Sequence, residues 1–242
     1  MKKLYEKSEI WFAVIWIIIY VVVMGNLQAN FGDESPISTI GLAVISVILF
    51  VFIRKNDLME KYGLIGWKDS KQYLFFIPFL LLVTVNFWGG IAMHYDALHQ
   101  VFAVISMVLV GVIEEIVFRG FLFKAMAKNN LTSAIIVSSV TFGAGHIVNL
   151  LTGHASLDVL LQIAYAIAIG FSFVMVFHKS GSLIPCIVTH SLIDVTSKFS
   201  NENLPESTQL TLNYVASIFI IVVAGGYALY LRNVKPEGDT TK

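Results

Sequence analysis

The sequence predicts an all-α, polytopic membrane protein: a bundle of about eight transmembrane helices with both termini in the cytoplasm. Three observations support this prediction, namely the composition, a series of long apolar stretches and the distribution of basic residues among the loops. Of the 242 residues, 57 % are hydrophobic and 13 % are charged, whereas soluble domains carry about a quarter charged residues. The formal net charge is zero, which gives no reason to expect nucleic acid as a partner.

The apolar stretches set the number of helices. A span across the lipid bilayer takes about 20 mostly apolar residues, and such stretches lie near 10–28, 37–53, 73–90, 98–125, 131–151, 157–177, 182–198 and 209–231. The stretch at 182–198 is weaker than the others, because it contains Pro185, His190 and Asp194. The first stretch follows a basic start, but its apolar run is longer than the run of about 7–15 residues in a signal peptide. We therefore expect it to stay as an uncleaved helix.

The loop charges decide whether the weak stretch spans the membrane. Lysines precede the first helix, the loop at 30–36 has no lysine or arginine, and the loop at 54–72 is again basic. Basic residues concentrate in cytoplasmic loops. If 182–198 spans, all sixteen lysines and arginines except Lys198 fall on the cytoplasmic side. If it does not, the basic C-terminal tail falls on the opposite side. A single membrane domain, 1–242, with eight helices fits best.

Ionisable residues within the predicted helices are few. Each costs roughly 2.5–3.5 kcal/mol to insert, so they are candidates for function. The fourth helix contains Glu114, Glu115 and Arg119, the fifth contains His146, and the seventh contains His190 and Asp194. At about 1.5 Å per residue, Glu114, His146 and Asp194 each lie about 21–24 Å from the cytoplasmic end of their helix. Polar groups on three helices thus lie at one depth, as a shared site requires.

Local spacing predicts two pairs in this set. Glu115 and Arg119 are four residues apart and can form an ion pair on one helix face, while Glu114 points about 100° away from that face. His190 and Asp194 are also four apart, so the carboxylate can fix the imidazole tautomer. Both pairs are equally consistent with a structural role, as a buried ion pair or as polar contacts between helices.

On the fifth helix, Phe142 and His146 share one face, and two glycines thin the helix beside the histidine. A glycine at such a position admits a substrate backbone or a neighbouring helix. Three ordered strings now stand on three predicted helices: Glu114-Glu115-Ile116-Val117-Phe118-Arg119, Phe142-Gly143-Ala144-Gly145-His146 and His190-Ser191-Leu192-Ile193-Asp194.

Together the strings resemble the CAAX-protease and bacteriocin-processing family of intramembrane endopeptidases, whose signatures are EExxxR, FxxxH and HxxxN or HxxxD. Each string alone is short, but the ordered set is specific. The resemblance covers about 98–200, the catalytic core of the family. It implies hydrolysis of peptide bonds in a membrane-associated protein or peptide, within a cell membrane that we expect to be the bacterial cytoplasmic membrane.

The resemblance also implies a role for each residue. Glu114, with His146, would activate water, and His190 would stabilise the oxyanion. Asp194 stands where many members have asparagine, and an ionised carboxylate cannot donate a hydrogen bond, so we expect it to orient His190. The residues expected to support the site are Glu115, Arg119, Phe118 and Phe142.

Several alternatives stay open at this point. No cofactor is favoured, but a catalytic zinc ion with Glu114, His146 and His190 as ligands is also consistent with these residue types. The alternative function is that of a non-proteolytic bacteriocin-immunity or membrane-partner binding protein. A transporter ranks last, because the sequence has neither internal repeats nor matching interrupted helices. Prenylated CAAX proteins, bacteriocin leader peptides and membrane-bound regulators are all compatible substrates.

Overall fold

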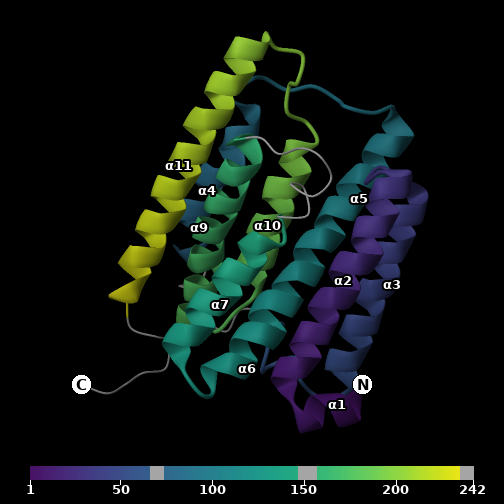
Figure 1. Ribbon diagram of the computed structural model, residues 1–242, viewed down its shortest axis with the longest axis vertical. Helices are drawn as coiled ribbons and strands as arrows, with labels where there is room; N and C mark the ends of the chain where they lie inside the picture. Colours follow the sequence, from purple (N-terminus) through teal and green to yellow (C-terminus); the bar gives the residue numbers. More distant parts are fainter. Residues whose placement is uncertain (66–73, 147–156, 235–242) are drawn as a thin grey trace.

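The computed structural model describes residues 1–65, 74–146 and 157–234 as a bundle of helices (Figure 1). The elements are α1 (Lys2–Lys7), α2 (Glu9–Phe31), α3 (Pro36–Lys55), α4 (Ile77–Val83), the 3-10 helix η2 (Thr84–Phe87), α5 (Ala97–Glu114), the π-helix η3 (Glu115–Phe123), α6 (Lys124–Ala127), α7 (Leu131–Ala144), α9 (Leu157–Ser180), α10 (Ile184–Ser197) and α11 (Glu206–Arg232). Within these three ranges the extended pairing is limited to an isolated bridge between Ile91 and Ser200.

Five of the described helices are long and apolar enough to cross a membrane: α2, α3, the continuous unit Ala97–Ala127, α9 and α11. They confirm the predicted helical membrane bundle. The three shorter apolar helices, Ile77–Phe87, α7 and α10, coincide with the remaining predicted stretches. The exact count of eight spans and the side on which the termini lie stay predictions.

Side chains on the outside of the bundle are apolar, as lipid contact requires. Val47 on α3 is 60 % exposed, and Val222 and Leu229 on α11 are 65 % and 68 % exposed. Contiguous exposed apolar faces of this kind are unusual on soluble monomers and mark a membrane or partner surface. Some polar residues of the long helices are turned inward: Thr39 of α3 and Ser106 of α5 are buried and pair through their hydroxyl groups at 2.8 Å.

Capping residues fix where the helices of the site begin. The carboxylate of Asp96 accepts hydrogen bonds from the backbone N–H groups of Leu98 and His99 at the start of α5. The side chain of Asn130 accepts one from Ser133 N–H at the start of α7. Both are residue types that satisfy the free N–H groups of a first helical turn. They set the registers of the helices that carry Glu114 and Phe142.

Small residues let the helices of the site approach each other closely. A Cβ on Gly111 of α5 would lie 2.8 Å from the backbone nitrogen of Ser191 on α10. A Cβ on Gly143 of α7 would lie 2.3 Å from the Ile167 side chain on α9, and one on Gly170 would lie 3.0 Å from the Ser139 carbonyl oxygen. Backbone approach at small residues is the usual way in which membrane helices pack. Gly143 therefore admits a neighbouring helix.

The two ends of the bundle differ in charge. The basic end is formed by α1, the start of α2, the end of α3 and the α6–α7 turn, and its lysines and arginines include Lys2, Lys7, Arg54, Lys55 and Lys128. The acidic end is formed by the loops 32–35, 88–96 and 198–205, and its carboxylates include Asp33, Glu34, Asp96 and Glu202. Among the described residues of the acidic end, Lys198 is the one lysine or arginine, and it forms an ion pair with Asp33.

Candidate active site

Glu114 is the last residue of α5, and the nine residues that follow it form the π-helix η3, all of them buried. Widened helical turns of this kind are rare and occur mostly at functional sites. Such turns change which backbone groups are hydrogen-bonded within the helix. In η3 the Phe118 carbonyl oxygen accepts a hydrogen bond from the Ser138 hydroxyl of α7 at 2.9 Å. The polar side chains of the fourth predicted span thus lie where the helix changes its winding.

The Glu114 carboxylate faces α2, the helix opposite. Its Oε1 accepts a hydrogen bond from the Tyr20 hydroxyl at 2.7 Å, and its Oε2 lies 3.8 Å from His190 Nε2. Tyr20 therefore holds one carboxylate oxygen of Glu114 in place. The Glu114 side chain is still 18 % exposed, so its carboxylate also reaches open space. Tyr20 lies on the first helix, for which the sequence predicts no functional residue. The available signal was a hydroxyl-bearing aromatic residue in the middle of an otherwise isoleucine- and valine-rich helix.

Glu115 and Arg119 form the ion pair expected from their spacing, but the pair also holds a histidine. Glu115 Oε1 accepts from Arg119 Nη1 and from His190 Nδ1, both at 2.9 Å. The side chains of Glu115 and Arg119 are completely buried. The guanidinium carbon of Arg119 lies 4.0 Å from the centre of the Phe142 ring, a cation–π arrangement. The expected supporting residues Glu115, Arg119 and Phe142 therefore lie directly behind His190.

His190 is held on both nitrogens. Because Nδ1 contacts the Glu115 carboxylate, Nδ1 carries a proton, and Nε2 faces the carboxylates on the cavity side. Nε2 lies 3.3 Å from Asp194 Oδ2, one turn further along α10. Asp194 was expected to orient His190. It contacts the imidazole at Nε2, whereas the contact at Nδ1 comes from Glu115, which sequence reasoning paired with Arg119 alone.

His146 lies two residues beyond the end of α7, where its backbone N–H bonds to the Gly143 carbonyl oxygen at 3.1 Å. Its ring meets Phe142 edge to face with centroids 6.2 Å apart, and Phe142 meets His190 in the same way at 5.4 Å. Phe118 packs on the other side of Phe142 at 5.6 Å. The Phe142 ring thus separates and spaces the two histidines.

Two adjoining cavities meet at these residues. The first, here called the α2 cavity, has a volume of about 580 Å³ and is lined by Tyr20, Gly25, Glu114, His146, Asp194 and Lys198 among others. The second, the α9 cavity, has a volume of about 230 Å³ and is lined by Glu114, His146, Gln162, Tyr165, His190 and Asp194 among others. The four residues expected to be catalytic therefore share one cavity, while Glu115 and Arg119 stand behind its wall.

Polar residues that sequence reasoning did not single out complete the α9 cavity. Gln162 and Tyr165 of α9 line it, as does Asn86 of η2. Asn86 donates from its side-chain amide to the Ile193 carbonyl oxygen at 2.8 Å and so joins η2 to α10. Glutamine, asparagine and tyrosine are common in soluble proteins too, and no local spacing ties these three to the glutamates and histidines. Only the packing of the helices brings them together.

The possible metal ligands do not form a metal-binding group. A catalytic zinc ion takes about three protein ligands with a further open position. Among the side chains of residues 1–65, 74–146 and 157–234, no three histidines, cysteines, aspartates or glutamates are arranged to hold a metal ion. In this arrangement Glu114, His146 and His190 are not gathered around one point as zinc ligands.

The fold and the cavity define a multi-pass α-helical membrane protein with a glutamate–histidine site inside the bundle. A family model described as Type II CAAX prenyl endopeptidase Rce1-like matches residues 96–196, the part of the chain that contains all three motifs. The match confirms the family resemblance of this part of the chain. It supports intramembrane proteolysis as the general activity and a membrane-associated peptide as the substrate. No curated protein and no solved structure gives a match.

Proposed function

We propose that the protein is an intramembrane endopeptidase in which Glu114 is the general base. The observation that carries this proposal is the shared cavity: the Glu114 carboxylate lines it together with both site histidines and Asp194. Amide hydrolysis needs a base for water, a donor for the oxyanion and a site that limits bulk water. The cavity offers a carboxylate and imidazole groups inside an apolar bundle.

Water is activated between Glu114 and His146. The Tyr20 hydroxyl occupies Oε1 of Glu114, so Oε2 is the oxygen that accepts the proton of a water molecule in the cavity. His146 lines the same space and orients this water. The water oxygen then attacks the carbonyl carbon of the peptide bond, and the new C–O bond forms as the proton passes to Glu114.

His190 stabilises the tetrahedral oxyanion. In the doubly protonated imidazolium form, Nδ1–H is held by Glu115, and the Nε2 proton points toward the cavity and is held by Asp194 until the oxyanion forms. Preorganised donors of this kind act strongly where water is excluded. Glu114 then returns its proton to the amide nitrogen, the C–N bond breaks, and a carboxylic acid and an amine leave. Water is the only co-reactant that the step needs.

Mass spectrometry of membrane peptides tests this function. Cells that produce wild-type protein should contain new peptide termini that are absent from cells that produce Glu114→Gln protein at the same level. Glu6→Gln is the matched control, because Glu6 lies on the exposed side of α1 at the basic end. If wild-type and Glu114→Gln cells give the same termini, the protease proposal fails. If a biological effect also persists in Glu114→Gln, the non-proteolytic binding function replaces it.

A further inference from the structure

Among the cavities of the described residues, the two that site residues line extend toward one end of the bundle, whereas separate cavities of about 750 Å³ and 420 Å³ at the basic end are lined by none of the site residues. From Glu114 the α2 cavity follows α2 through Tyr20, Gly25 and Gln28 to the turn at Asp33. On α10 it reaches from Asp194 to Lys198, just beyond the end of that helix. Asp33 and Lys198 belong to the acidic end, so this cavity connects the catalytic residues with that end of the bundle.

A third cavity continues the α9 cavity in the same direction. It has a volume of about 370 Å³, and its polar lining includes Asp158, Asn201, Glu202 and Asn213. Gln162 lines this cavity and both of the others. The cavities that adjoin the site therefore extend from Glu114 toward the acidic end, one along α2 and the others along α9.

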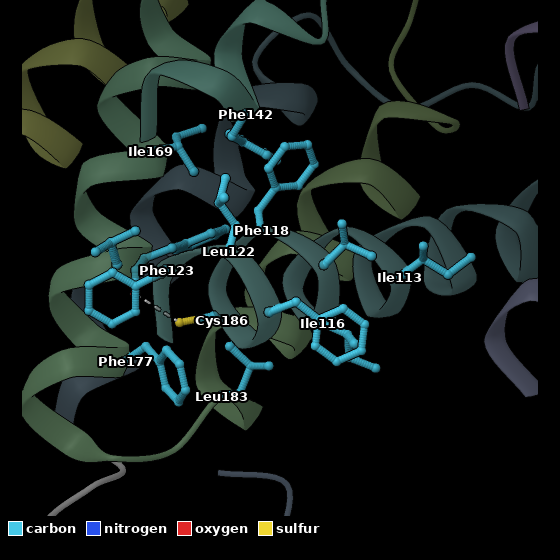
Figure 2. Close-up of a cluster of buried hydrophobic side chains, with 14 of the residues drawn as sticks. Ile113, Ile116, Phe118, Leu122, Phe123, Phe142, Ile169, Phe177, Leu183 and Cys186 are labelled. Atoms are coloured by element: carbon cyan, nitrogen blue, oxygen red, sulfur yellow. Dashed lines mark hydrogen bonds between the residues drawn. The ribbon is translucent and has the colours of Figure 1, made fainter. Parts of the chain in front are cut away.

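Between the site and the basic end, the core of the bundle is packed with apolar side chains. Figure 2 shows Phe118, Phe123, Phe177, Leu183 and Cys186 in one buried cluster, and each is at most 3 % exposed. Further toward the basic end, the rings of Phe12, Phe52, Tyr62 and Phe121 contact one another, with centroids as close as 4.8 Å between Phe12 and Phe52. The Glu115–Arg119 pair lies on this side as well, completely buried.

Charge relates these two ends to the two sides of the membrane. The lysines and arginines of the described loops gather at the basic end, and basic residues mark the cytoplasmic side of a membrane protein. Lys198, the exception at the acidic end, is balanced by its ion pair with Asp33. Tyr95 donates a further hydrogen bond to Asp33 at 3.1 Å. The rule thus assigns the acidic end, and with it the mouth of the α2 cavity, to the extracytoplasmic side.

We infer that peptide and water enter the site from the extracytoplasmic side, so that the bond to be hydrolysed belongs to an exported or outward-facing segment of a membrane-associated protein. This inference rests on the proposed protease function for its substrate. The direction of entry, however, can be measured without any cleavage. A cytoplasmic peptide tail would have to pass the packed aromatic half of the bundle and is not the expected substrate.

Cysteine labelling tests the direction of entry. The chain has one cysteine, Cys186, which is buried, so wild-type protein is the unlabelled blank. Gly25→Cys places a thiol in the α2 cavity, at a position where an added Cβ meets no atom within 4 Å. Asn129→Cys, in the exposed α6–α7 turn at the basic end, is the reference for the other side. The probe is a charged, membrane-impermeant maleimide.

We expect Gly25→Cys to be labelled in sealed right-side-out vesicles and to lose that labelling in inside-out vesicles, with Asn129→Cys showing the reverse. Labelling of Gly25→Cys from the cytoplasmic side alone would overturn the inference. So would the absence of labelling from both sides in protein that is folded and reacts after solubilisation. The same pattern in a Gly25→Cys, Glu114→Gln double variant would show that access does not depend on catalysis.

The positions of the new peptide termini test the substrate class separately. Termini that depend on Glu114 should map to extracytoplasmic segments of membrane-associated proteins. Glu114-dependent termini in cytoplasmic segments would overturn the inference and leave the protease function standing. Outward labelling of Gly25→Cys without any Glu114-dependent termini would have the opposite meaning: the direction of entry would hold and the protease function would fail.

Discussion

Arg119→Met should destabilise the protein by about 3–5 kcal/mol, the usual cost of removing one partner from a buried ion pair. Arg119 Nη1 donates to Glu115 at 2.9 Å, and both side chains are completely buried. Methionine fills much of the same volume but carries no charge, so the Glu115 carboxylate keeps only His190 as a hydrogen-bond partner. The loss of the cation over the Phe142 ring acts in the same direction.

Thermal unfolding in detergent measures this loss. A cost of this size corresponds to a decrease in Tm of about 6–20 °C, by the scaling known for proteins of similar length. Arg54→Met is the matched control, since Arg54 is exposed at the end of α3, and it should change stability by less than about 0.5 kcal/mol. The double variant Glu115→Gln, Arg119→Met should regain much of the loss, because glutamine is neutral and keeps an acceptor oxygen for His190.

The reasoning would be refuted if Arg119→Met unfolded at the same temperature as Arg54→Met. It would also be refuted if the double variant were destabilised by the sum of both single changes. Additive losses are the behaviour of independent sites, and they would mean that Glu115 and Arg119 do not compensate each other in the folded protein.

Four further outcomes are expected. Tyr20→Phe removes a hydrogen bond to the Glu114 carboxylate, worth about 1.5–3 kcal/mol. It should reduce the rate of cleavage about tenfold or more, while circular dichroism shows that the fold persists. An unchanged rate would show that Tyr20 does not position Glu114. Gly143→Ala should lower stability by about 1–3 kcal/mol, because the added methyl group overpacks against α9. Gly225→Ala, where no atom lies within 4 Å of the new Cβ, should raise stability by about 0.5–1 kcal/mol. Equal Tm shifts of the two variants would contradict the close approach of α7 and α9. Burial alone would raise the pKa of Asp33, but the hydrogen bond and the charge of Lys198, with smaller contributions from Glu34 and Tyr95, together outweigh it and lower the pKa. The contribution of this pair to stability is thus present above the unfolded-state pKa of about 3.9 and is lost as the pH falls through the lower folded pKa, so acid should reduce the Tm of wild-type protein more than that of Asp33→Asn. Cleavage by purified protein should survive chelation, with metal content followed by elemental analysis, and loss of activity that zinc restores would reverse this expectation.

Much of the fold follows from short-range patterns in the sequence. Apolar stretches of about 20 residues and alternating loop charges are sufficient to predict a helical membrane bundle. The Glu115–Arg119 contact follows from a spacing of four residues within one helix. The three ordered motifs locate the site, because each motif lies on a single helix and carries its own polar residues.

The contacts that organise the site join residues far apart in the chain. Tyr20 and Glu114 are separated by 94 residues, and Glu115 and His190 by 75. The period of a helix shows which of its faces is polar, but not which other helix lies opposite that face. Sequence reasoning therefore assigned the orientation of His190 to Asp194, its neighbour on the same helix, and could not see that Glu115 holds the other imidazole nitrogen.

The π-helix and the reduced length of the short helices escaped prediction. The widened winding of η3 depends on how nine buried residues pack against α2 and α7, and no local motif announces it. The stretches at 73–90, 131–151 and 182–198 contain the helices Ile77–Phe87, α7 and α10, each shorter than the expected span. Hydropathy marks where a chain is apolar, whereas caps and turns decide where a helix begins and ends.

Hydrolysis in heavy-oxygen water by purified protein tests the central claim most directly. The substrate is the membrane-associated peptide whose cleavage the comparison of wild-type and Glu114→Gln cells identifies, and the enzyme is reconstituted in lipid nanodiscs. Wild-type protein should release a fragment whose new carboxyl group carries one heavy oxygen atom, and Glu114→Gln should release none. Cleavage by purified Glu114→Gln protein at the wild-type rate would contradict the assignment of Glu114 as the base that activates water.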